Sequence, residues 1–209
     1  MLFSELCKKY PKIKLIVDFY NKEALELIEQ YKIPHFFSNS VTSIDQMQGL
    51  IAYHPTDMYI CEELGFFLDK VSEILHKNHI KVRVYPNICQ SSWTETPSLK
   101  TFFIRPNDIP IYSTFVDVFE LVSDKERQQV IFKIYKQEKW MGLINEIIPT
   151  FKHDLDNKYV LSSFGKIRSK CGKRCMYKTG SCNICERFAE LGKTLEKSHI
   201  IIRSMKKKD

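Results

Sequence analysis

The chain has 209 residues, of which 44% are hydrophobic, 27% are charged and 12% are aromatic, and its formal net charge is +7. This composition is that of a soluble globular protein with enough material for one core, and the 7 glycines argue against glycine-rich phosphate loops. No segment reaches the roughly 18 consecutive apolar residues of a membrane span. Because the N-terminus also lacks a secretory cleavage pattern, we expect a cytoplasmic protein without membrane contact.

Strand-like and helix-like segments alternate over the first 150 residues. The predicted strands are 13–19, 35–39, 57–61, 81–85, 101–105 and 116–121. The predicted helices are 2–10, 21–31, 44–51, 67–78 and 124–148, with a helical turn at 107–112. Asn21 and Ser43 are the predicted N-caps of two of these helices. The alternation predicts parallel strands joined by right-handed crossovers.

Two layouts fit six such strands, a doubly wound sheet and a partial or complete (β/α) TIM-like barrel. The first strand is not followed by G-x-G-x-x-G, and polar residues recur where the strands end, so we favour the barrel. These polar residues are Asp18, Asn39, Glu62, Asn87, Arg105 and Glu120. In either layout the carboxyl ends of the strands form the functional face.

Glu62, Arg105 and Glu120 are the candidate catalytic residues, because carboxylates facing an arginine can bind a polar substrate or act as acid and base. The alternative for each residue is a helix cap or a structural ion pair. Arg83 lies within the fourth predicted strand and needs a carboxylate partner inside a barrel. Glu62 is its nearest candidate at a strand end.

A polar connector at 151–165 leads into the most specific motif in the chain. Cys171, Cys175, Cys182 and Cys185 lie within 15 residues with the spacing C-x3-C-x6-C-x2-C. Four thiolates complete the coordination of a structural zinc ion or of a [4Fe–4S] cluster, and the spacing leaves both open. The alternative is four reduced cysteines without a metal.

The positive charge is concentrated around these cysteines. Residues 166–209 hold 13 basic and 4 acidic side chains, a net charge of +9, whereas the rest of the chain has a net charge of −2. This asymmetry indicates contact with nucleic acid or another polyanion, with a solvated basic tail as the alternative. We therefore predict a barrel-like domain over 1–150 and a basic, cysteine-rich metal-binding segment over 151–209, which ends in a helix at 186–197 and an apolar run at 200–202.

Three segments between 58 and 121 resemble the U32 peptidase-like family. They are 58–65 (MYICEELG), 81–87 (KVRVYPN), and 103–108 (FIRPND) leading into 116–120 (VDVFE). The resemblance implies a TIM-barrel-like domain and, as in several members, a [4Fe–4S] cluster and a role in RNA or quinone hydroxylation. The cysteines of that family are widely spread and its signature block is absent here, so no catalytic residue is carried over.

Two functions remain open at this point. The first is a metal-centre-containing (β/α) barrel enzyme, similar to the U32 family, that acts on RNA or on a small polar substrate. The second is a non-enzymatic protein whose zinc-stapled basic segment binds nucleic acid or another protein. A radical-SAM enzyme is disfavoured, because no cysteine follows the first predicted strand between Asp18 and Tyr31.

Overall fold

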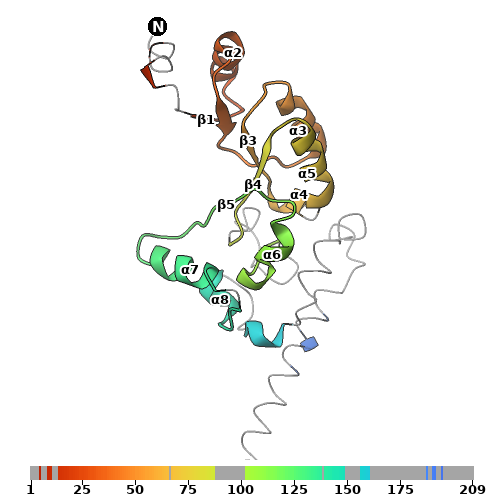
Figure 1. Cartoon of the computed structure of the whole chain (residues 1–209), viewed down its shortest axis with the longest axis vertical. Helices are drawn as coiled ribbons and strands as arrows, with labels where there is room; N and C mark the ends of the chain where they lie inside the picture. The colour runs from red at the N-terminus through yellow and green to blue at the C-terminus, as the bar shows by residue number, and fades with distance from the viewer. Residues whose placement is uncertain are drawn as a thin grey trace, which may run out of the picture. The chain divides into compact units, whose positions relative to one another are not determined.

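The computed structural model describes residues 14–65, 67–87, 102–137, 139–148 and 156–160, together with residues 5, 9, 10, 187, 190, 191 and 194. The chain divides into two compact units (Figure 1). Unit 1 comprises Met1–Val84 and Phe115–Phe119, and unit 2 comprises Tyr85–Thr114 and Glu120–Asp209. The predicted division into 1–150 and 151–209 stays a prediction.

Unit 1 is an α/β structure with a five-stranded parallel sheet. Its strands are β1 (Leu15–Val17), β2 (His35–Phe37), β3 (Asp57–Tyr59), β4 (Lys81–Val84) and β5 (Val118–Phe119). They pair in the order β1-β2-β3-β4-β5, all parallel. This order has no reversal, which distinguishes it from a doubly wound sheet and matches consecutive β/α units.

The connecting helices are α2 (Lys22–Tyr31), α3 (Ile44–Ile51), α4 (Glu62–Gly65) and α5 (Leu68–Lys77). The predicted caps are confirmed, because Asn21 accepts from the Ala24 N–H and Ser43 accepts from the Gln46 N–H. Right-handed crossovers between neighbouring strands place these helices on one side of the sheet, where Figure 1 shows α3 and α5. The opposite face of the sheet carries none of them.

One row of apolar side chains crosses the sheet on its helix-covered face. The strand register aligns Val17, Phe37, Met58 and Val82, and all four are buried. The helices contribute buried apolar side chains at helical spacing, namely Ile28, Met47, Leu50, Val71 and Leu75. The core of unit 1 therefore lies between this row and the helices, as the hydrophobic periodicity predicts.

Three turns that lead from a helix into a strand use the same backbone device. Lys32, His54 and His79 have positive φ angles of 51°, 54° and 59°. Each is directly followed by a buried apolar residue, in order Ile33, Pro55 and Ile80. A left-handed residue after a helix end, with an apolar contact behind it, is a common way to stop a helix. Because none of these three residues is glycine, the positive φ angle strains each turn by about 1 kcal/mol.

Unit 2 contains η2 (Pro106–Asp108), α6 (Ile109–Tyr112), α7 (Gln128–Tyr135), α8 (Ile144–Ile147) and η3 (Asn157–Tyr159). The helical turn at 107–112 is confirmed. Its core gathers Phe103, Ile131, Ile134, Trp140, Ile144, Ile147, Ile148 and Val160. Phe103 and Val160 are 57 residues apart, so the core joins segments that are distant in sequence.

Two predicted elements are wrong. Residues 102–105 are buried but lie outside any strand, and the strand that pairs with β4 on that side is β5. Ile104 N–H donates to Pro86 O at 2.8 Å. The single helix at 124–148 is two helices, α7 and α8. Gly142 lies in the break, and a Cβ there would collide with the Glu146 carboxylate and the Trp140 indole.

Several predicted elements lie partly or wholly outside the described residues. These are the helix at 2–10, the connector at 151–165, the cysteine cluster and the run at 200–202. Within the predicted helix at 186–197, Arg187, Glu190, Leu191 and Thr194 are described and helical. No helix in the described part of the chain is long and apolar enough to cross a membrane.

Candidate functional site

The face of the sheet opposite α2, α3, α4 and α5 in unit 1 carries a charged cluster. Asp57 begins β3 and is fully buried, Arg83 lies in β4, and Lys14 immediately precedes β1. Asp57 Oδ2 accepts from Lys14 Nζ at 3.3 Å and from Arg83 Nη2 at 3.4 Å. The Thr56 hydroxyl donates to the same oxygen at 3.0 Å. One carboxylate thus connects β1, β3 and β4.

Two aromatic rings hold the Arg83 guanidinium on this face. Its carbon lies 4.9 Å from the Phe36 ring centroid and 5.7 Å from the Tyr59 ring centroid. Both contacts are within the range of a cation–π interaction. The Arg83 side chain is 19% exposed and that of Lys14 is 43% exposed. Asp57 Oδ1 has no hydrogen-bond partner among the described residues, so this buried oxygen still lacks a donor.

Asp57 is a carboxylate partner of Arg83 that the sequence did not indicate, and a contact between Glu62 and Arg83 stays a prediction. The sequence suggested Glu62, whose backbone lies in α4 and whose side chain is outside the described residues. Asp57 was overlooked because it begins its strand instead of ending it. Its signal in the sequence is faint, since a charged residue at the start of a strand is equally typical of a solvated end.

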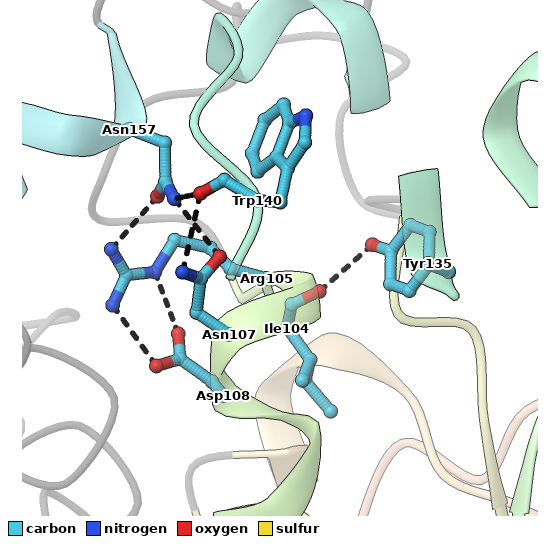
Figure 2. A network of polar contacts seen from close by, with 7 residues as sticks. All are labelled: Ile104, Arg105, Asn107, Asp108, Tyr135, Trp140 and Asn157. Carbon is cyan, nitrogen blue, oxygen red and sulfur yellow. Dashed lines mark hydrogen bonds and ion pairs between the residues drawn. The ribbon is translucent and has the colours of Figure 1, made fainter. Parts of the chain in front are cut away.

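A second polar network lies in unit 2, around Arg105. Its guanidinium donates from Nε to Asp108 Oδ2 at 2.7 Å and from Nη2 to Asp108 Oδ1 at 2.9 Å. This is a bidentate ion pair, and its two side chains are 2% and 4% exposed. Nη1 donates to Asn157 Oδ1 at 2.9 Å. Figure 2 shows the guanidinium between these two partners.

Asn157 extends the network toward Trp140. Its side-chain nitrogen donates to Asn107 Oδ1 at 2.9 Å and to Trp140 O at 2.7 Å, and its backbone N–H donates to Gly142 O at 2.9 Å. Because a buried amide is costly unless it is hydrogen-bonded, these bonds fix the chain at 156–160 against the turn at 105–108. This stretch lies near the start of the predicted 151–209 segment and precedes Cys171 by about ten residues.

Tyr135 borders this network (Figure 2). Its hydroxyl donates to Ile104 O at 2.8 Å. Burial of the phenol, and secondarily the negative charge of Asp108, raise the pKa of Tyr135 well above its usual value. The side chain is therefore a neutral hydrogen-bond donor at physiological pH and holds the backbone just before Arg105.

The six predicted strand-end residues fall into both units, and their convergence on one mouth stays a prediction. Asp18 accepts from the Tyr20 N–H and Asn39 accepts from the Ser38 hydroxyl, both at 2.9 Å. Asn87 donates to Val122 O at 2.6 Å and accepts from Val122 N–H at 3.1 Å. Glu120 is half-buried. The catalytic roles of Glu62, Arg105 and Glu120 also stay predictions.

A histidine–carboxylate pair joins α5 to the loop before β5. His76 Nε2 lies 2.9 Å from Asp117 Oδ2, which also accepts from the Val82 N–H at 2.8 Å. Partial burial alone would raise the pKa of Asp117, but these hydrogen bonds and the charges of His76 and Lys81 hold it below its usual value. The sequence indicated only that His76 lies near a helix end.

The predicted ligands Cys171, Cys175, Cys182 and Cys185 lie outside the described residues. Within the described ranges, no group of three or more His, Cys, Asp and Glu side chains could hold a metal ion. Comparison with protein-family models, with curated proteins and with solved structures finds no match to this chain. The function must therefore be inferred from the chemistry of the two polar clusters and of the cysteine motif.

Proposed function

We propose that this protein is a metal-centre protein built on an open (β/α) barrel, and that it acts enzymatically on RNA or on a small polar substrate. The sheet would be the inner wall of the partial barrel. The four-cysteine segment would hold the metal. This is the function that the U32-like resemblance implies, with Glu62, Arg105 and Glu120 as the candidate catalytic residues of this chain.

The observation that carries the proposal is the charge on the face of the sheet opposite α2, α3, α4 and α5. A parallel sheet is ordinarily covered on both faces and rich in apolar side chains. Here one face has the expected apolar row, while the other has Asp57, Arg83 and Lys14 around one carboxylate oxygen. Polar groups held in place on the inner wall of a β/α fold are suited to orient a polar ligand.

The metal part of the proposal rests on Cys171, Cys175, Cys182 and Cys185. Thiolates at this spacing would hold zinc as a structural ion or a [4Fe–4S] cluster as a redox centre. A cluster favours the enzymatic version, since hydroxylation needs electron transfer. Their basic surroundings, with a net charge of +9 over 166–209, favour a polyanionic partner such as RNA.

The enzymatic version is tested on RNA from cells that produce the protein. Total RNA is digested to nucleosides and compared by mass spectrometry between cells with the intact chain and cells with a Cys182→Ser variant. A modified nucleoside that depends on Cys182 supports the proposal. Identical nucleoside profiles contradict RNA modification and leave a small polar substrate.

The alternative is a non-enzymatic protein whose zinc-stapled basic segment binds nucleic acid or another protein. The concentration of the basic excess in 166–209 favours it. A colourless protein with one zinc ion per chain, and RNA affinity that falls steeply with salt, would support this alternative. RNA binding that is absent or independent of salt would contradict it.

A further inference from the structure

One edge of strand β1 is unpaired within the described part of the chain. Leu15 N–H donates to Pro34 O at 3.0 Å and Ser38 N–H donates to Val17 O at 2.8 Å, so Leu15 and Val17 direct their backbone groups toward β2. Because these groups alternate along a strand, the N–H and C=O of Ile16 point to the opposite edge. Among the described residues no strand pairs there. The Ile16 side chain is 66% exposed.

An apolar groove runs beside this edge, between β1 and α2. It has a volume of about 170 Å³, and its apolar lining includes Leu15, Val17, Ala24, Leu27, Ile28 and Ile33. Leu27 is 38% exposed, and Tyr31, one turn further along α2, is 45% exposed. An exposed apolar strand edge beside an apolar groove is an association surface that natural proteins ordinarily cover.

The sequence of β1 is complementary to itself. In antiparallel pairing about a two-fold axis at Ile16, Lys14 lies opposite Asp18 of the second copy, and Leu15 lies opposite Val17. The two Ile16 residues exchange both backbone hydrogen bonds. Lys14, Ile16 and Asp18 share one face of the strand, so the two charged pairs are directly opposed, which stabilises a strand pair.

We propose that β1 pairs antiparallel with β1 of a second copy of this chain, which forms a two-fold dimer with one continuous sheet. The axis brings the α2 helices of the two copies together on the same side of the sheet. Leu27 and Tyr31 of each copy then cover the apolar groove of the other copy. The Lys14 ammonium group has three N–H donors and uses one of them for Asp57, so the others are left for the new contact. Asp18 keeps one carboxylate oxygen, since Oδ1 accepts from Tyr20.

The oligomeric state of the full chain tests this proposal. Sedimentation equilibrium over about 1–100 µM brackets the dissociation constants of ordinary dimers. The proposal predicts a species of twice the 24.7 kDa chain mass. An Ile16→Asp variant places two carboxylates at the axis and is expected to be monomeric throughout this range. A monomeric wild-type protein, or an Ile16→Asp variant that remains dimeric, would overturn the proposal.

A charge exchange identifies the register. Asp18→Lys places a second ammonium group opposite Lys14 of the other copy and should weaken the dimer by about tenfold or more. The Lys14→Asp/Asp18→Lys double variant restores opposite charges and should recover most of the affinity. Glu126→Lys is the matched control, because it makes the same charge change at an exposed position in unit 2. Equal effects of Asp18→Lys and Glu126→Lys would contradict the pairing.

The Lys14→Asp change also places a carboxylate beside Asp57, so each variant is first checked by circular dichroism. If the double variant does not fold, Ile16→Asp and the Asp18→Lys comparison still decide the question. Metal content is measured on the same samples. A monomeric protein with a full metal centre would contradict the dimer alone, and a dimer without metal would contradict the proposed function alone.

Discussion

The bidentate pair between Arg105 and Asp108 makes a sharp stability prediction. Asp108→Asn keeps the shape of the side chain but removes its charge and turns one acceptor into a donor that faces the guanidinium. The two side chains are 2% and 4% exposed, so water cannot replace the lost partner. Removing one partner of a buried ion pair costs about 3–5 kcal/mol. We expect a loss of this size in the free energy of unfolding.

Urea unfolding measures this loss, with Trp fluorescence and far-UV circular dichroism followed together, since coincident transitions are needed for a two-state analysis. Trp140 reports directly, because its carbonyl belongs to the network. Glu73→Gln is the matched control, as it removes a solvent-exposed surface pair with Lys77 and should leave the urea midpoint nearly unchanged. A loss below about 1 kcal/mol in Asp108→Asn would refute the reasoning from burial.

Three further changes have expected outcomes in the same assay. Asn87→Ala leaves both backbone groups of Val122 without their side-chain partner and should cost about 1–3 kcal/mol, whereas an unchanged urea midpoint would show that water replaces the amide. His79→Gly relieves the positive φ angle and should stabilise the protein by about 0.5–1 kcal/mol, so a lower midpoint would contradict the strain. Burial lowers the pKa of His35, although its hydrogen bond to Ile33 O opposes this shift. The unfolded chain then binds a proton first, so stability should fall as the pH drops from about 6.5 toward the folded pKa, and His35→Leu should flatten this slope.

Local signals in the sequence predicted local structure well. The N-caps Asn21 and Ser43 are confirmed, because a capping side chain and the helix it begins are only three residues apart. The parallel α/β class also followed from the alternation of strand-like and helix-like segments. These predictions succeed because propensity and hydrophobic period act over one or two turns of chain.

Predictions that depend on distant partners were less successful. The apolar run at 102–105 has the composition of a strand but lies in the core of unit 2, where Phe103 packs with α7 and α8. Periodicity could not tell a buried extended segment from a strand, since strand pairing depends on segments that are distant in the sequence. The break before α8 was missed because Gly142 matters through its contact with Trp140.

The polar clusters show the same limit. Asp108 lies three residues after Arg105, a spacing that the sequence could have indicated as an ion pair. Asn157 lies 52 residues from Arg105, and a single asparagine in a polar stretch gives no sign of that contact. Asp57 meets Lys14 and Arg83 only through the strand register. Register depends on how whole strands pack, and this cannot be deduced from local patterns in a single sequence.

Metal content most directly tests the central claim that Cys171, Cys175, Cys182 and Cys185 form a metal centre. The full chain is purified without oxygen, and its iron, zinc and absorption spectrum are measured beside those of Cys182→Ser. We predict about four irons per chain with a broad band near ~400 nm, or one zinc ion without colour, and loss of the metal in the variant. A metal-free wild-type protein, or a variant that keeps its full metal content, would contradict the claim.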